Sequence, residues 1–144
     1  FLISTRGYDA AERLHVTDAE FNLIEQVNLT EVYPFIGQEI GRPRLFERDG
    51  WFYLMGRNWP VRTDENRVMQ QALFRFDPTN LAITSHVILD NYEEGRVIDG
   101  YYPVPYWQED ERGILFNVID YKSVVSRFPG PNIVRSEFLW DEVR

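Results

Sequence analysis

Residues 41–59 constrain the fold more than any other part of the chain. Their sequence is Gly-Arg-Pro-Arg-Leu-Phe-Glu-Arg-Asp-Gly-Trp-Phe-Tyr-Leu-Met-Gly-Arg-Asn-Trp, so Asp49 and Gly50 separate two mainly apolar runs. Glycine accepts the positive φ that a tight turn demands, and Asp-Gly between apolar runs is a strong hairpin signal. The segment therefore predicts two antiparallel strands, over residues 43–47 and 51–56.

Parts of this hairpin recur on both sides of it. Residues 1–8, 52–59 and 115–122 share one plan, in which a short apolar strand ends in a basic or aromatic cluster. A helix is the alternative for residues 18–27, but no segment has a capped 3.6-residue apolar stripe. Further strands or extended segments are predicted over residues 1–6, 13–17, 21–29, 69–77, 81–89, 101–107, 114–121 and 133–140.

The predicted strands fall into four-stranded units that repeat at roughly 50 to 60 residues, a spacing typical of a β-propeller. We therefore predict an all-β fold of about three four-stranded antiparallel blades, incomplete at both ends. The blades would comprise residues 1–37, 38–97 and 98–144 of a single partial propeller domain. An ordinary β-sandwich with coincidental spacing is the alternative.

Three blades do not close a ring, and exposed apolar blade faces drive association. The remaining blades are therefore expected on missing chain or on a second copy of this chain. Because the sequence begins at Phe1, inside a predicted strand, we expect a processed or truncated product. The localisation is left open; an upstream signal would make the protein secreted or periplasmic.

Composition narrows the classes of partner. The formal net charge of −8 argues against a general nucleic-acid binder, because phosphate binding needs a basic surface. No apolar run approaches the ~20 residues of a membrane helix, so no membrane partner is expected. The chain has no cysteine, which excludes disulfides and thiol chemistry. The many aromatic residues (Phe 10, Tyr 8, Trp 4) suit β packing or a sugar-binding cleft.

In a propeller, the loops that enter the first strands and leave the second strands meet at one mouth of the central funnel. Arginine forks pair with carboxylates, aromatic faces stack on sugar rings, and carboxyl groups act as acid and base. Asp99, Glu39 and Tyr101 are the catalytic candidates. Asp120 and Tyr8 fall at the same mouth. The substrate-binding candidates are Arg6, Arg42, Arg44, Arg57, Asn58, Trp59, Tyr102, Tyr121 and Lys122.

Several of these candidates have a structural alternative. Arg42 and Arg44 fall on one predicted strand, and we expect at most one of them to face the funnel and the other to pair with Glu47 or Asp49. Tyr101 and Tyr102 are adjacent and should point to opposite faces. Asp99, which precedes a glycine, is as well suited to shaping a turn as to catalysis.

Other polar and aromatic residues have no role in the predicted site. Trp51, Trp107 and Trp140 are predicted to pack in the core. His15 and His86 fall on different strands without metal-ligand spacing, so we predict no metal site and no cofactor. Nucleotide-binding and serine-hydrolase motifs are absent.

Two segments carry a resemblance to sialidase-like propellers. They are residues 41–54, quoted above, and residues 99–118, where Asp-Gly-Tyr-Tyr-Pro-Val-Pro-Tyr-Trp is followed by Gly-Ile-Leu-Phe-Asn-Val. The resemblance implies an arginine cluster that grips a carboxylate, with Arg42 as one member. It also implies an aspartate as acid/base and a tyrosine nucleophile, with Tyr101 or Tyr102 as the candidates.

The same hairpin also resembles five-bladed glycosidases of the arabinanase and fructosidase kind. That resemblance implies carboxylate catalysis, with Glu39 and Asp99 as the candidates. Together these features predict a propeller that hydrolyses or binds a carbohydrate in its central funnel. The alternative is a non-catalytic lectin-like or scaffolding module.

Overall fold

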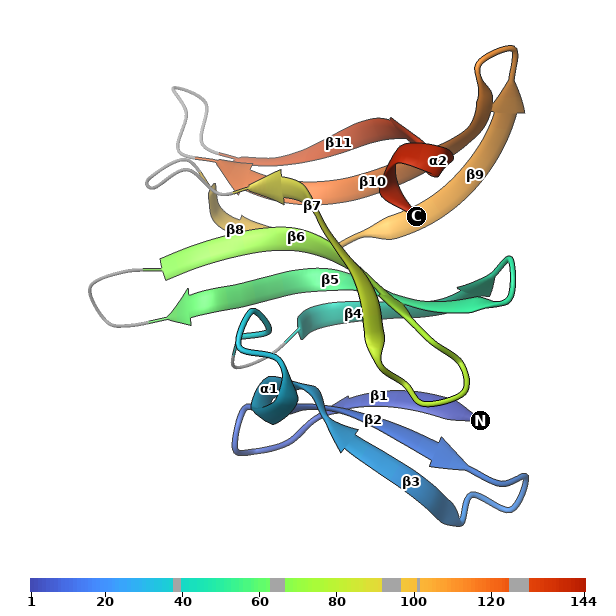
Figure 1. The fold of residues 1–144 in the computed structure, drawn as a ribbon. Coiled ribbons are helices and arrows are strands. Elements are labelled where there is room, and N and C mark those ends of the chain that lie inside the picture. The colour runs from blue at the N-terminus through green and yellow to red at the C-terminus, as the bar shows by residue number, and fades with distance from the viewer. Residues whose placement is uncertain (38–39, 63–66, 92–96, 101, 125–129) are drawn as a thin grey trace.

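The chain is all-β, as predicted, and consists of three antiparallel sheets stacked in chain order (Figure 1). The computed structural model describes residues 1–37, 40–62, 67–91, 97–100, 102–124 and 130–144. Each sheet is built from strands that follow one another along the chain, and none of the described strands joins the sheet of another stretch.

The first sheet, sheet A, has three strands in the order β1-β2-β3. Its elements are β1 (Leu2–Arg6), β2 (Glu12–Thr17), β3 (Leu23–Asn28) and the short helix α1 (Leu29–Val32). The helical alternative for residues 18–27 is wrong, because residues 23–27 belong to β3, which pairs with β2, and residues 18–22 form the connection between the two strands. Instead the helix begins after Asn28, whose side chain caps it by accepting a hydrogen bond from the Glu31 backbone N–H.

The middle sheet, sheet B, has four strands in the order β4-β5-β6-β7. Its strands are β4 (Ile40–Arg48), β5 (Trp51–Arg62), β6 (Arg67–Phe76) and β7 (Ile83–Asn91). The predicted hairpin is confirmed: Arg48 pairs with Trp51, and the two turn residues have φ values of 53° at Asp49 and 79° at Gly50. Two successive positive φ values are typical of a type I′ turn, whose twist matches the flanking strands.

The last sheet, sheet C, is built around its longest strand, β10. Its elements are β8 (Val97–Gly100), β9 (Val104–Asp110), β10 (Gly113–Val124), β11 (Gly130–Leu139) and the short helix α2 (Trp140–Val143). β8 and β9 pair with different parts of the same edge of β10 and so share one position in the sheet. The segment between them carries Tyr102.

Two apolar cores lie on opposite faces of sheet B. Because side chains alternate along a strand, Leu54 and Phe74 face sheet A, whereas Tyr53 and Met55 face sheet C. The second core contains the fully buried Trp140, with Trp51 and Trp107 packed against it, as predicted for these tryptophans. Sheet B is thus covered on both faces, which fixes the stacking order.

Neither of the two short helices in the described residues is long and apolar enough to cross a membrane. The described part of the chain forms three sheets and no closed ring. The propeller therefore stays a prediction, while the coarser expectation of successive antiparallel sheets is confirmed.

Candidate ligand-binding site

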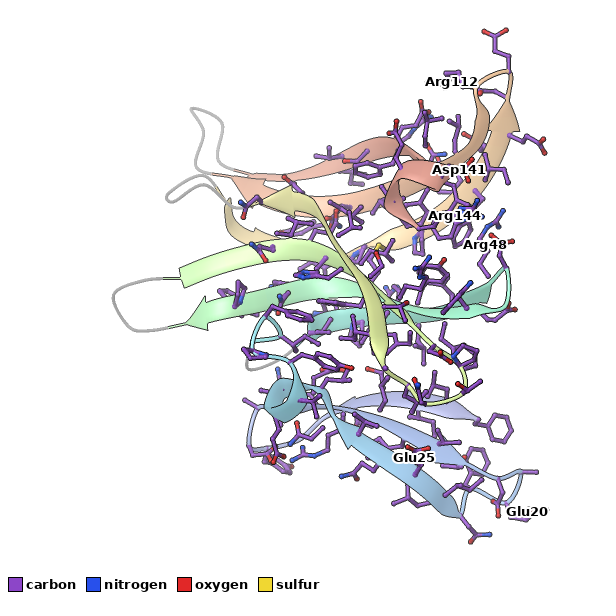
Figure 2. The ribbon with its side chains drawn as sticks, viewed as in Figure 1. Glu20, Glu25, Arg48, Arg112, Asp141 and Arg144 are labelled. Atoms are coloured by element: carbon purple, nitrogen blue, oxygen red, sulfur yellow. The ribbon has the colours of Figure 1, made fainter. Side chains whose placement is uncertain are left out.

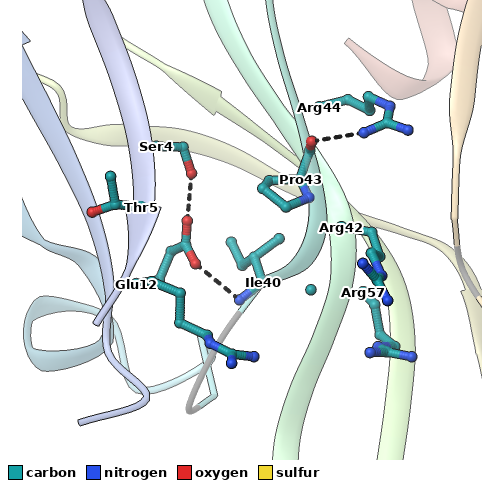
Figure 3. Close-up of a pocket in the computed structure, with 10 residues that line it drawn as sticks. Ser4, Thr5, Glu12, Ile40, Arg42, Pro43, Arg44 and Arg57 are labelled. Carbon is teal, nitrogen blue, oxygen red and sulfur yellow. Dashed lines mark hydrogen bonds between the residues drawn. The ribbon is translucent and has the colours of Figure 1, made fainter. Parts of the chain in front are cut away.

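A pocket of about 540 Å³ lies between the β1 edge of sheet A and the strands β4 and β5 of sheet B (Figure 3). It is open to solvent on one side and mainly polar. The lining residues are Ser4, Thr5, Arg6, Glu12, Ile40, Gly41, Arg42, Pro43, Arg44 and Arg57.

Four arginines and a single carboxylate line this pocket, although the chain as a whole carries a net charge of −8. Figure 3 shows Arg42 and Arg57 beside one another, with Arg44 further along β4. Among the described residues, neither Arg42 nor Arg44 has a carboxylate partner. Positive charge concentrated in a concave site favours an anionic ligand.

Two arginines of β4, Arg42 and Arg44, line the pocket on either side of Pro43. A β-bulge interrupts the pairing with β5 between Gly41 and Arg44, and Arg42 has a φ of 56°, in the left-handed region. A bulge breaks the alternation of side chains and re-aims them. Both Arg42 and Arg44 line the pocket, whereas the expectation that at most one of them faces a propeller funnel stays a prediction. Among the described residues, Arg44 donates to the Pro43 carbonyl and does not form the expected ion pair with Glu47 or Asp49.

Glycines let the bulged segment of β4 pack closely on β5. A Cβ on Gly56 would stand 2.6 Å from Ile40 Cγ2 and 2.9 Å from the Gly41 carbonyl oxygen. A Cβ on Gly41 would stand 3.0 Å from Arg57 Nε. Gly56 therefore requires glycine for a close approach rather than for an unusual φ, whereas a side chain at Gly41 would have to displace the Arg57 guanidinium slightly.

Tyr102 connects the arginines of sheet B with sheet C. The Arg42 guanidinium lies 4.7 Å from the centre of the Tyr102 ring, and the Arg57 guanidinium lies 5.9 Å from it. Arg57 also lies 5.1 Å from the Trp59 ring centre, and Tyr102 meets Tyr121 edge to face at 5.4 Å. The arginines and aromatic residues predicted for one mouth thus come together from separate sheets.

Asp120 holds Tyr102 in place. Its Oδ1 accepts a hydrogen bond from the Tyr102 backbone N–H at 2.6 Å, and its Oδ2 accepts one from Gln71 Nε2 at 2.6 Å. Asp120 is only 3% exposed, so it joins sheet C to sheet B from the interior rather than from the pocket. Its two bonds satisfy the buried carboxylate.

Asn58 has the corresponding role between sheets A and B, and the structure corrects its predicted contact with substrate. The side chain is fully buried. Its Nδ2 donates to the Phe35 carbonyl at 2.8 Å, and its Oδ1 accepts from the Gly37 N–H at 3.0 Å. With both ends of the amide engaged by backbone, Asn58 secures a connecting segment and is not presented to a ligand.

Glu12 is a pocket residue that sequence reasoning missed. It is 1% exposed, and its carboxylate accepts from Ser4 Oγ at 2.5 Å and from the Ile40 N–H at 3.2 Å (Figure 3). Its burial could have been inferred from the strand alternation, because Glu12 lies two residues before Leu14 and therefore on the same, buried face of β2. A carboxylate at an inward-facing strand position is rarely solvated.

The remaining candidates fall partly or wholly outside the described residues. Glu39 and Tyr101 lie outside them entirely. The backbones of Asp99 and Lys122 belong to β8 and β10, where Asp99 pairs with Ser123 and Lys122 with Gly100, but their side chains are not described. The predicted catalytic set therefore stays a prediction.

The two histidines lie apart on sheets A and B. His86 packs against both Phe35 and Phe74, with its ring centre 4.7 Å from each of theirs, and burial lowers its pKa. His15 Nε2 lies 2.6 Å from Thr5 Oγ1. Within the described ranges, no group of three or more His, Asp or Glu side chains could hold a metal ion.

No protein-family model matches the chain, and no curated protein sequence matches it.

Proposed function

We propose that this chain forms part of a β-propeller and binds an acidic carbohydrate in the arginine-lined pocket. The observation that carries the proposal is the convergence of Arg6, Arg42, Arg44 and Arg57 on one pocket of about 540 Å³. Guanidinium forks pair bidentately with carboxylates. The pocket is also within the size range of ordinary small-molecule sites.

The aromatic residues beside the arginines support a sugar rather than a small inorganic anion. Tyr102 and Trp59 each lie within 6 Å of the Arg57 guanidinium, and Tyr121 extends this group into sheet C. Rings of this kind provide flat apolar faces for pyranose rings, while the arginines select a charged substituent.

The stacking of the sheets supports the propeller. Each sheet is a run of sequence-adjacent antiparallel strands, and sheet B uses opposite faces for its two neighbours. Blades of a propeller are built and packed in this way. The sandwich alternative fits less well, because β-sandwiches commonly connect their two sheets by Greek-key crossovers.

A glycan array tests the binding proposal, with carboxylate-bearing glycans compared with the same glycans reduced to neutral alcohols. Wild-type protein should retain the acidic glycans and not their neutral forms. Arg42→Gly should lose at least tenfold in affinity, because it removes a charge-assisted pair worth about 1.5–3 kcal/mol. The proposal fails if Arg42→Gly binds as wild type does.

Arg112→Ala is the matched control, since Arg112 is an exposed arginine ion-paired with Asp110 and Glu137 on sheet C. It should bind as wild type does. Turnover of the retained glycans, measured in the same samples, separates glycoside hydrolysis from a lectin-like role. Release of free acidic sugar by wild type would support the catalytic form of the proposal.

A further inference from the structure

A second pocket, of about 240 Å³, lies at the other end of β4 and is independent of the proposed glycan site. It is formed where the end of β4 meets the β9–β10 hairpin of sheet C. The lining residues are Arg48, Trp107, Gln108, Glu109 and Ile114. Figure 2 shows Arg48 on the side of the molecule where α2 and the β9–β10 turn lie.

Arg48 is held in this pocket by two indole rings. Its guanidinium carbon lies 4.9 Å from the Trp107 ring centre and 5.6 Å from that of Trp140. Asp49 Oδ2 lies 3.7 Å from Arg48 Nε, which is too far for a hydrogen bond, and that oxygen already accepts from Trp140 Nε1 at 3.1 Å. Arg48 is thus a positioned cation, and its ion pair with Asp49 leaves it without a direct hydrogen bond to that carboxylate.

Two N–H donors on residues that line the pocket lack an acceptor. Arg48 Nε and Trp107 Nε1 are both buried, and neither has a hydrogen-bond partner among the described residues. An unsatisfied buried donor costs roughly 1–3 kcal/mol, and such groups are rare in native proteins. Both nitrogens are out of reach of solvent, so a ligand in the pocket would meet the remaining, exposed part of the Arg48 side chain, which is 27% exposed.

The rest of the lining sets the character of that ligand. Ile114 is 38% exposed and, with the Trp107 ring, offers an apolar surface beside the cation. Glu109 is exposed at the rim and repels additional negative charge. We propose that this pocket binds a small organic monocarboxylate with a flat apolar body, whose carboxylate is received by Arg48.

Benzoate is a suitable probe, with benzamide as the neutral molecule of the same shape. Titration should be followed by the ¹H–¹⁵N signal of the Trp107 indole, assigned by its loss in Trp107→Phe. Benzoate should bind saturably and shift that signal, and benzamide should bind at least tenfold more weakly. Equal binding of the two molecules, or no saturable binding of benzoate, would overturn the proposal.

Asp49→Asn provides a test in which the expected result is a gain in affinity and the fold is retained. Asn-Gly is favoured in type I′ turns, and the amide oxygen can still accept from Trp140 Nε1, so the hairpin should be retained. Removing the negative charge beside Arg48 should tighten benzoate severalfold and leave benzamide unchanged. An unchanged affinity for benzoate would contradict the proposed role of Arg48.

Arg48→Gln should abolish the preference for benzoate over benzamide. Arg135→Gln is the matched control, since Arg135 is an exposed arginine on β11 that pairs with Glu137 at 2.6 Å. It should bind benzoate as wild type does. If Arg135→Gln weakens benzoate as much as Arg48→Gln does, the effect is general charge attraction and the pocket is not the site.

Discussion

Arg42 combines a strained backbone with a position at the candidate site. Its φ of 56° lies in a region that costs a non-glycine residue about 1–2 kcal/mol. Residues held in such conformations often cluster at functional sites, where the surrounding structure imposes them. Here the bulge between Gly41 and Arg44 imposes the conformation, and it brings Arg42 over Tyr102.

Substitutions at Arg42 should therefore depend on the backbone as much as on the charge. Arg42→Gly should keep the free energy of unfolding within about 1 kcal/mol of wild type, because relief of φ strain offsets the greater chain entropy of glycine. Arg42→Val should lose about 2 kcal/mol, since β-branched residues tolerate this region poorly. Urea denaturation measures both; equal losses would show that the bulge does not impose the positive φ.

His86 should make stability depend on pH in the mildly acidic range. Burial against Phe35 and Phe74 lowers its pKa below the usual 6.5, so the unfolded chain binds a proton more readily than the native protein does. The contribution of His86 to the free energy of unfolding is therefore fully present above pH 6.5. It declines as the pH falls from 6.5 toward the lowered pKa of the native protein. His86→Phe should keep the stacking and remove this decline.

The measurement is the free energy of unfolding of wild type and His86→Phe at several pH values between 7.5 and 4.5. The difference between the two proteins isolates His86 from the other titrating groups. A difference that stays constant across this range would contradict the account.

At the scale of elements, single buried polar side chains join the sheets. Glu12 of β2 accepts from the Ile40 N–H at the start of β4, and Asp120 of β10 accepts from Gln71 of β6. These bonds supplement the two apolar cores and fix the sheets in register with one another. They also set the positions of the pocket residues that follow them.

Glu12→Ala should destabilise the protein by about 2–3 kcal/mol, because it leaves the buried Ile40 N–H without an acceptor and opens a small cavity. Glu12→Gln is the matched control, since an amide oxygen can accept from Ile40 and the Ser4 hydroxyl can reverse its role. Thermal unfolding compares the two variants. Comparable losses in both would assign the effect to charge rather than to these hydrogen bonds.

Most elements could be predicted from the sequence because strand signals are local. Alternating apolar residues and the Asp49-Gly50 turn specify the hairpin without help from distant residues. The bulge at Arg42 could not be predicted, since it arises where Ile40 and Gly41 pack against Gly56 across two strands. The same limit applies to Asn58, whose burial depends on a connecting segment more than 20 residues away in sequence.

For the whole molecule, the propeller proposal predicts a common axis at the place where arginines from sheets A and B meet aromatic residues from sheets B and C. The candidate site lies where β1, β4 and the segment before β9 approach one another, and the strands at the opposite edges of the three sheets (β3, β7 and β11) would diverge from that axis. A radial arrangement of this kind is what a propeller requires. If the sheets were instead stacked as parallel layers, the distance between neighbouring sheets would be the same at both edges.

Spin-label distances between sheets A and C test this arrangement most directly, and the absence of native cysteine makes the labelling clean. The inner pair is Thr5→Cys on β1 with Val104→Cys on β9, and the outer pair is Gln26→Cys on β3 with Arg135→Cys on β11; all four side chains are exposed. A radial arrangement predicts a clearly shorter distance for the inner pair than for the outer pair. Equal distances would contradict it and, with it, the common site built from three sheets.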